Sequence, residues 1–354
     1  TLILDGGDIL QGSPFAYWLS RSPVEGAKVS ARVMNLAGYQ FVTIGNHDFN
    51  FGRETLESYL SHLDARCVSA NVEGVSGVER TAVVTLENGL RIGIVGIVTD
   101  YVNIWERPEH LSGITISDPI PAAAAALEEL RGKTDLNLCV YHGGFERDLT
   151  TGRVLSSTHE NVAYRICQEL DFDILLTGHQ HMSVPGQMVS GTFVVQPSDR
   201  GQEFLRIEAV VSGTEKRLSS HTIPAGGACH PQWLRQFAQM EHGAQDWLDQ
   251  VVGHLPHPLL PDAPLKMAAE GSGLADLFNA VQLEVSGAQL SAASLANDVA
   301  GLPQVVRRRD LLIAYPYTNT LTVLRITGAV LRQAMERSAA YFTRGEDNTL
   351  RVSD

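Results

Sequence analysis

Residues 41–49, FVTIGNHDF, contain the pattern that decides the fold. A run of apolar and β-branched residues leads into a turn that carries Asn46 and His47. A short apolar run that ends in glycine and polar residues is typical of a buried strand followed by a tight turn. Glycine suits such a turn because it tolerates positive φ and close approach of the backbone.

The same pattern occurs three more times in the first half of the chain. The other clusters are GGDILQGSP from residue 6, YHGG from residue 141 and GHQH from residue 178, and they contribute Asp8, His142, His179 and His181. In open α/β sheets, sites form beyond the carboxyl ends of the strands. We therefore expect side chains from the four clusters to converge on one point.

The residue types at these strand ends favour a metal centre. Divalent metals accept carboxylate, carboxamide oxygen and imidazole as ligands. One carboxylate can bridge two cations, and Asp8 is the candidate for that role. Two ions roughly 3.5–4 Å apart can activate water and clamp the attacking and leaving oxygens of a phosphoryl group. Taken singly, each cluster is more typical of a plain turn or a packed histidine, but the ordered combination favours a two-metal phosphoesterase.

These motifs resemble those of the calcineurin-like metallophosphoesterases and, within them, the 5′-nucleotidase family. GGDILQGSP resembles the GD block of that family, GNHDFNFG its GNH[DE] block, and GHQH its final G-H-x-H block. The resemblance implies that Asp8 bridges two metals and that His181 serves one of them. It implies that the other metal is completed by Asn46, His142 and His179.

The resemblance also assigns roles to residues next to these ligands. It implies that His47 is the catalytic imidazole, which stabilises charge on the phosphoryl group in the transition state. Typical 5′-nucleotidases often carry Asp at the position of Asn50, paired with the catalytic histidine. Asn there resembles instead the branch that acts on 2′,3′-cyclic nucleotides and 3′-nucleotides. We therefore place Asn50 among the candidate substrate-binding residues.

The end of the chain resembles the C-terminal domain of the same family, through SGAQLSAASLANDVAG and AYPYTNTLTVLRITGAVLRQAMERSAAYF. In the family, an Asn in the first segment and an aromatic residue after proline in the second contact the nucleoside, which implies that Asn297 and Tyr317 bind substrate. An aromatic face stacks on a base with roughly 1–3 kcal/mol. Tyr317 alone is more typical of a packed tyrosine, and the motif around it favours the binding role. The typical glycine-arginine run after the Asn is replaced by residues 298–302, which again favours the cyclic-nucleotide branch.

Two elements of the family pattern are missing from this sequence. The family begins with a D-x-H block on its first strand, and none stands before Asp8. Its second stacking aromatic residue lies later than residue 354. We therefore expect the sequence to be a fragment, in which the second metal keeps only Asp8 and His181 and is weakly held. The expected cofactors are two divalent ions in the intact protein, Mn, Co, Zn or Fe, with one better held here.

The expected architecture has three parts. The resemblance implies a four-layer α-β-β-α sandwich at 1–228, an inter-domain helix and proline-rich linker at 229–264, and a smaller, partial α+β substrate-binding domain at 265–354. Local patterns predict the individual elements. Helices are expected at 26–37, 52–63, 121–131, 232–252 and 330–341. Strands are expected at 79–98, as a pair around the turn at 87–89, and at 192–196, 203–211 and 321–326.

Composition restricts the partners of the protein. A net charge of −13 argues against binding of nucleic acid polymers, whose phosphates need a basic surface. A small nucleotide is compatible, since metal ions meet its charge. No apolar run approaches the ~18–20 residues of a membrane helix, so we expect no membrane span. The four cysteines show no close pairing, which favours free thiols over a disulfide framework. The resemblance favours the bacterial periplasm or cell surface.

The motifs together predict an enzyme, a metal-dependent hydrolase of 2′,3′-cyclic nucleotides and 3′-nucleotides. One alternative is a 5′-nucleotidase or nucleotide-sugar hydrolase. Another is a non-catalytic nucleotide-binding surface protein. A third is a sulfur-compound hydrolase on the same two-metal scaffold, against which the Tyr317 segment argues because a base-stacking residue would have no purpose there.

Overall fold

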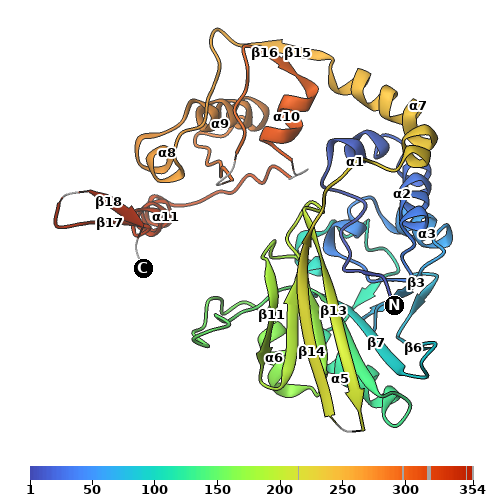
Figure 1. Ribbon diagram of the computed structural model, residues 1–354. Coiled ribbons are helices and arrows are strands. Elements are labelled where there is room, and N and C mark those ends of the chain that lie inside the picture. The colour runs from blue at the N-terminus through green and yellow to red at the C-terminus, as the bar shows by residue number, and fades with distance from the viewer. Residues whose placement is uncertain (214, 297–298, 317–319, 348, 353–354) are drawn as a thin grey trace. The chain divides into compact units, whose positions relative to one another are not determined.

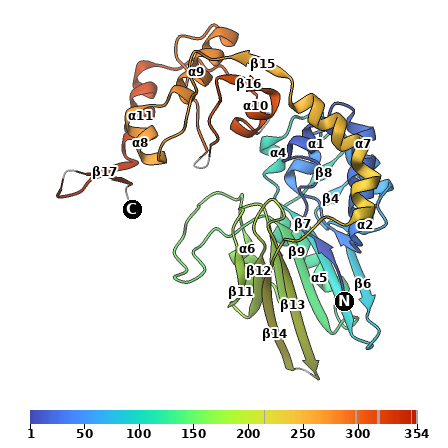
Figure 2. The same ribbon diagram turned by 45° about the horizontal axis from the view of Figure 1, so that its top comes forward.

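The computed structural model describes residues 1–213, 215–296, 299–316, 320–347 and 349–352. The chain divides into two compact units, residues 1–238 and 239–354, and each is described by itself. Figures 1 and 2 show helices and strands alternating along most of the first unit. The limits expected for the catalytic domain, the linker and the C-terminal domain stay predictions.

The first unit begins with a small parallel sheet in the strand order β1-β2-β3-β5. Its strands are β1 (Leu4–Asp5), β2 (Phe41–Val42), β3 (Arg66–Val68) and β5 (Val78–Glu79). Between them lie α1 (Pro14–Leu19), α2 (Pro23–Ala37), the 3-10 turn η1 (Asn46–Phe49) and α3 (Arg53–Ser61). Because helices return the chain between parallel strands, the loops after β1 and β2 leave the same edge of the sheet.

A second sheet has six strands in the order β11-β12-β10-β9-β7-β6. Its four central strands run parallel, and the two edge strands are antiparallel to their neighbours. The strands are β6 (Thr81–Thr85), β7 (Arg91–Val98), β9 (Leu136–His142), β10 (Ile174–Thr177), β11 (Val184–Val189) and β12 (Thr192–Gln196). The intervening helices are α4 (Val102–Trp105), α5 (Pro119–Leu130) and α6 (Ala163–Glu169).

Two antiparallel pairs accompany these sheets. The pair β4 (Val72–Glu73) and β8 (Thr115–Ile116) is short. The pair β13 (Glu203–Ser212) and β14 (Glu215–Pro224) is a long two-stranded ribbon, visible in Figure 1 beside β11. Ile207, Val211 and Leu218 of this ribbon pack against the core between the two main sheets.

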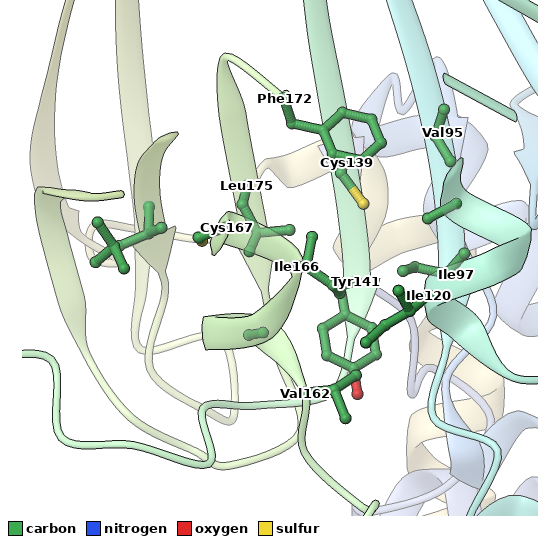
Figure 3. Close-up of a cluster of buried hydrophobic side chains, with 14 of the residues drawn as sticks. Val95, Ile97, Ile120, Cys139, Tyr141, Val162, Ile166, Cys167, Phe172 and Leu175 are labelled. Atoms are coloured by element: carbon green, nitrogen blue, oxygen red, sulfur yellow. The ribbon is translucent and has the colours of Figure 1, made fainter. Parts of the chain in front are cut away.

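Three apolar cores separate four layers. One lies between the first sheet and α2 and α3, and it includes Ala31, Val42 and Leu56. The middle core joins the two sheets. The third lies between the second sheet and α5 and α6, where Figure 3 shows the ring of Tyr141 among apolar side chains of these helices and the segment that precedes α6. The expected four-layer α-β-β-α sandwich is therefore confirmed.

Strand β9 shows how one sequence serves two cores. Its residues at 136, 138 and 140 belong to the core between the sheets, whereas Cys139 and Tyr141 belong to the core under α5 and α6. This alternation is the period of two that a strand requires. The sheets approach closely at Gly96, where an added Cβ would overlap a carbonyl oxygen of β3.

The second unit has its own small core of Met267, Leu274, Leu302, Val306 and their neighbours. The helix α7 (Pro231–Leu248) crosses the division between the units. The helices that follow are α8 (Pro264–Glu270), α9 (Gly273–Ser286), α10 (Arg308–Ala314) and α11 (Gly328–Ala339). Two antiparallel pairs complete the unit: β15 (Val251–His254) with β16 (Val305–Arg307), and β17 (Phe342–Arg344) with β18 (Leu350–Val352).

One predicted element is wrong. Residues 321–326 were expected to form a strand, but within the described ranges they have no ladder partner, and Leu321, Val323, Leu324 and Ile326 are exposed. Alternation shows which side chains would share a face, but a strand forms only where backbone N–H and C=O groups find partners. The alanine-rich helix also begins earlier than expected, at Pro119, because the Asp118 side chain accepts a hydrogen bond from Ile120 N.

The four cysteines are free, as expected. Three of them are buried and Cys229 is exposed. In the part of the chain that the structure describes, no helix combines the length and the apolar character needed to cross a bilayer.

Candidate metal centre

The loops after β1 and β2 approach each other through two glycines. Gly7 has φ of 91°, a conformation that residues with a Cβ rarely adopt. A Cβ on Gly45 would overlap the carboxylate and backbone nitrogen of Asp8. The glycine of the GNHD cluster is therefore needed so that the Asp8 loop can lie against it.

Asp48, the fourth residue of the GNHD cluster, fastens the two loops together. Its Oδ2 accepts hydrogen bonds from the backbone N–H of Asp8 at 2.9 Å and of Gly45 at 2.8 Å. Its Oδ1 accepts from the N–H of Ile9 at 2.8 Å and of Leu10 at 3.0 Å. Burial and the Asp8 carboxylate raise the pKa of Asp48, against the lowering effect of these N–H donors.

Four of the predicted ligands meet at the ends of these strands. His142 Nε2 lies 3.0 Å from Asp8 Oδ2 and 3.1 Å from Asn46 Oδ1. His179 Nδ1 lies 2.9 Å from the same oxygen of Asn46. The side chains come from the ends of four strands, β1, β2, β9 and β10, which belong to both sheets.

Neighbouring groups orient three members of this cluster, Asp8 and the two histidines. His142 Nδ1 donates to the Gly6 carbonyl oxygen at 2.6 Å, and the backbone N–H of His47 donates to Asp8 Oδ1 at 2.8 Å. On the other side, Glu160 Oε1 lies 3.0 Å from His179 Nε2. The Trp105 ring stacks on His179 with centroids 5.4 Å apart.

The charged groups of the cluster shift one another's pKa values. Burial lowers the pKa of His142, but the Asp8 carboxylate and the Gly6 carbonyl raise it more, to about 9. Burial raises the pKa of Asp8, but His142 and His47 lower it further, so that the net shift is downward. Burial and the nearby His142 lower the pKa of His179. The Asp8 carboxylate therefore stabilises a positive charge at this point.

The donor chemistry of the cluster fits a divalent cation. Because His142 Nδ1 is occupied by the Gly6 carbonyl, the neutral ring turns its lone pair toward Asp8 Oδ2 and Asn46 Oδ1. Electron pairs that face one another in this way require a proton or a metal ion between them. Donors around an ion with bonds of about 2.1 Å lie about 3 Å apart, as these do.

The carboxamide of Asn46 is an integral member of the set. Within the described residues, no group of three or more His, Cys, Asp and Glu side chains is placed to hold a metal ion. The candidate site therefore depends on Asn46, which lies within 3.1 Å of both histidines. Second-sphere partners such as the Gly6 carbonyl and Glu160 are the groups that orient metal-ligating histidines in proteins.

The structure places the other predicted residues in different surroundings. His47 Nδ1 lies 2.8 Å from Asn50 Oδ1, so these two side chains form a pair. The His181 side chain is 52 % exposed, and its Nδ1 lies 3.8 Å from Asp199 Oδ2. Asn297 and Tyr317 lie outside the described residues.

The backbone at the centre is held in an unusual conformation. Asp8, His179 and His181 have φ of 67°, 67° and 54°, in the left-handed region that residues with a Cβ avoid. Such positions persist only where the surroundings enforce them, and they concentrate at functional sites. For the loop of His179, the buried side chain of Gln196 provides this support, with bonds to Gly178 O and Met182 N.

Sequence reasoning missed several residues of this centre. Asp48 stood in the GNHD cluster and could have been found from its position. Glu160, Trp105 and Glu106 lie in loops or at a short helix end, with no motif around them. Only the folded chain brings them to the cluster.

Comparison with known proteins now identifies the family. The profile of the calcineurin-like phosphoesterases matches residues 1–183. The chain belongs to this family. Its members are phosphoesterase and nucleotidase hydrolases. The profile of the 5′-nucleotidase C-terminal domain matches residues 251–354. Both matches confirm the resemblance drawn from the motifs.

Individual relatives agree with this membership. A 2′,3′-cyclic-nucleotide 2′-phosphodiesterase/3′-nucleotidase of Yersinia enterocolitica is 23% identical over 99% of this chain and 62% of its own length. The present chain thus spans about three fifths of that relative. The structure of a putative 5′-nucleotidase from Staphylococcus aureus has a TM-score of 0.87 and 28% identity, covering 99% of this chain and 70% of that one.

The fold is shared more widely than the activity. Sulfate thiohydrolase SoxB from Thermus thermophilus has a TM-score of 0.65 at 18% identity, covering 89% of this chain and 55% of that one. At this identity the likeness shows the fold alone.

Proposed function

We propose that this chain carries the hydrolytic centre of a metal-dependent nucleotide phosphoesterase. The observation that carries the proposal is that three contacts of 2.9–3.1 Å link Asp8, His142, Asn46 and His179 at the ends of four strands. Electron-pair donors that converge in this way, with the carboxylate and both imidazoles oriented by further groups, have the chemistry of a cation site.

The proposed ligand roles follow from the contacts. Asp8, Asn46, His142 and His179 would hold one divalent ion, and Asp8 with His181 would hold a second less strongly, because two protein ligands hold an ion weakly. Mn, Co, Zn and Fe all suit this mixture of carboxylate, carboxamide and imidazole. When bound, such ions polarise a phosphoryl group and make water more acidic.

The chain's own groups prepare the reaction. The Gly6 carbonyl and the His47 N–H hold His142 and Asp8 in position, so that little reorganisation accompanies binding. The His47 imidazole, held by Asn50, is proposed to stabilise the charge that develops on the phosphoryl oxygens. Asn297 and Tyr317 are proposed to contact the nucleoside, with Tyr317 stacking on the base.

For the substrate, we propose 2′,3′-cyclic nucleotides and 3′-nucleotides. Two observations support this choice over 5′-nucleotides: the partner of His47 is a carboxamide, Asn50, rather than a carboxylate, and the Yersinia relative carries that name. A 5′-nucleotidase activity is the second candidate, supported by the likeness to the Staphylococcus protein. We further propose, from the family resemblance, a location in the bacterial periplasm or at the cell surface.

A substrate panel tests these proposals. The metal-loaded protein is incubated with 2′,3′-cyclic AMP, 3′-AMP and 5′-AMP, and the products are separated by chromatography. We expect turnover of the first two to exceed that of 5′-AMP. Preference for 5′-AMP would reverse the substrate assignment, and binding of all three without turnover would indicate a nucleotide-binding protein.

Two variants test the roles of the residues. Asp8→Asn should abolish metal-dependent turnover, whereas Asp64→Asn, the same change at an exposed position, should leave it intact. His47→Ala should lower kcat by roughly 10²–10⁴-fold and change metal affinity little. A kcat within about twofold of wild type would contradict the catalytic role of His47.

A further inference from the structure

A chain of hydrogen bonds leads away from His47 to a buried carboxylate. His47 Nδ1 lies 2.8 Å from Asn50 Oδ1, and Asn50 Nδ2 donates to Glu106 Oε2 at 2.6 Å. Asn50 follows the 3-10 turn η1, and Glu106 follows α4, so two segments far apart in sequence meet here. Trp105, the residue before Glu106, stacks on His179 on the other side of the centre.

The Glu106 carboxylate is held firmly. Its side chain is 7 % exposed. Its Oε1 accepts the backbone N–H of Arg107 at 2.8 Å and lies 2.8 Å from His110 Nδ1. With Oε1 engaged by these two groups, Oε2 is the oxygen that faces Asn50. The carboxylate therefore presents a fixed acceptor to the Asn50 side chain.

This acceptor decides which way the Asn50 carboxamide faces. A carboxamide has one donating and one accepting end, and by itself it fits either way round. An ionised carboxylate only accepts, so the NH₂ end must face Glu106. The oxygen end then faces His47, and only a ring nitrogen that carries hydrogen can bond to it. The proton is therefore placed on Nδ1 of His47.

We propose that Glu106 is a positioning residue that sets the tautomer of His47 through Asn50. With the Asn50 oxygen accepting from Nδ1, this hydrogen bond also fixes the orientation of the His47 ring. The consequence for catalysis rests on the proposed function, but the tautomer itself does not.

The first test is spectroscopic and needs no turnover. The metal-free protein is labelled with ¹⁵N-histidine, and long-range ¹H–¹⁵N spectra are recorded at about pH 8.5, where an ordinary histidine is neutral. The His47 signals are assigned by their loss in His47→Gln. We expect Nδ1 to carry the hydrogen in the wild type. A hydrogen on Nε2 instead would overturn the proposal without any further variant.

Glu106→Gln then tests the cause. Glutamine keeps the shape of the side chain but offers both a donor and an acceptor, so Asn50 is free to face either way. We expect a detectable population of the Nε2–H form in Glu106→Gln and none in Glu109→Gln, the same change at an exposed position three residues away. Identical His47 tautomers in wild type and Glu106→Gln would refute the role of Glu106.

A double-mutant cycle separates positioning from plain structural support. In the wild-type background, Glu106→Gln should lower kcat about tenfold at unchanged KM, since Asn50 is then free to turn and no longer fixes the His47 ring. In an Asn50→Asp background, the carboxylate at 50 faces His47 directly, and Glu106→Gln should no longer lower kcat. Equal losses in both backgrounds would reveal a structural role only. An inactive wild type would refute the proposed function and leave the spectroscopic result standing.

Discussion

The change Asp48→Asn weakens the hydrogen bonds that join the loops after β1 and β2, while it keeps the shape of the side chain. The carboxylate accepts four backbone N–H groups, two on each oxygen. A carboxamide has one accepting end, so either orientation sets its NH₂ group against two N–H donors. Two bonds to a charged acceptor are lost, each of about 1.5–3 kcal/mol.

The expected loss of stability of the first unit is therefore about 3–6 kcal/mol, a large part of a total of order 5–15 kcal/mol. In urea, with a slope of about 2 kcal/mol/M, the midpoint should fall by roughly 2 M. Hydrogen exchange of peptides covering the loops after β1 and β2 assigns the transition to the first unit. Asp64→Asn, at an exposed position, is the matched control.

The result that would refute this reasoning is a stability of Asp48→Asn within about 0.5 kcal/mol of wild type, the range of ordinary surface substitutions. Metal affinity should fall together with stability, because the Asp8 loop would no longer be held against the GNHD turn. Retained metal affinity would show that other contacts suffice to place Asp8.

Three further outcomes are expected. Glu160→Gln should weaken metal binding, measured by calorimetry, by roughly 10–100-fold, since the carboxylate orients His179. An unchanged metal affinity would contradict this role of Glu160. Gly96→Ala should lower the thermal midpoint, because its Cβ would overlap a carbonyl oxygen of the facing sheet, whereas Gly226→Ala, with nothing within 4 Å, should not. A thiol reagent at pH 8 should modify only Cys229 in the native protein and all four cysteines after unfolding. The other three cysteines, Cys67, Cys139 and Cys167, are buried, and burial raises the pKa of their thiols, that of Cys167 to about 12. Modification of a second thiol in the native protein would contradict this burial.

The meeting of the four predicted ligands could be foreseen from the sequence because its cause is topological. Asp8, Asn46, His142 and His179 each follow an apolar run, and the ends of parallel strands gather at one edge. The strand at 192–196 was likewise predicted at its observed limits, since β-branched residues bounded by turns leave few alternatives.

The strand that was predicted wrongly and the site residues that were missed both depend on contacts that no local sequence pattern encodes. The strand predicted at 321–326 lacks a partner in the described chain, and pairing is a property of two segments rather than one. Glu106 and Glu160 reach the centre only because α4 and the segment before α6 fold back toward it. A glutamate in a polar loop gives no sign of this in the sequence.

The left-handed backbone at Asp8, His179 and His181 has a practical consequence for engineering. Each such residue opposes folding by about 1–3 kcal/mol relative to a residue suited to that conformation. Glycine at any of these positions would relax the loop while deleting a side chain proposed for catalysis. A library selected for heat tolerance alone should therefore enrich glycine at the codon of the exposed His181, whereas the contacts of the Asp8 carboxylate with His47 and His142 oppose its replacement. Selection for turnover would have to run in parallel to keep the protein an enzyme.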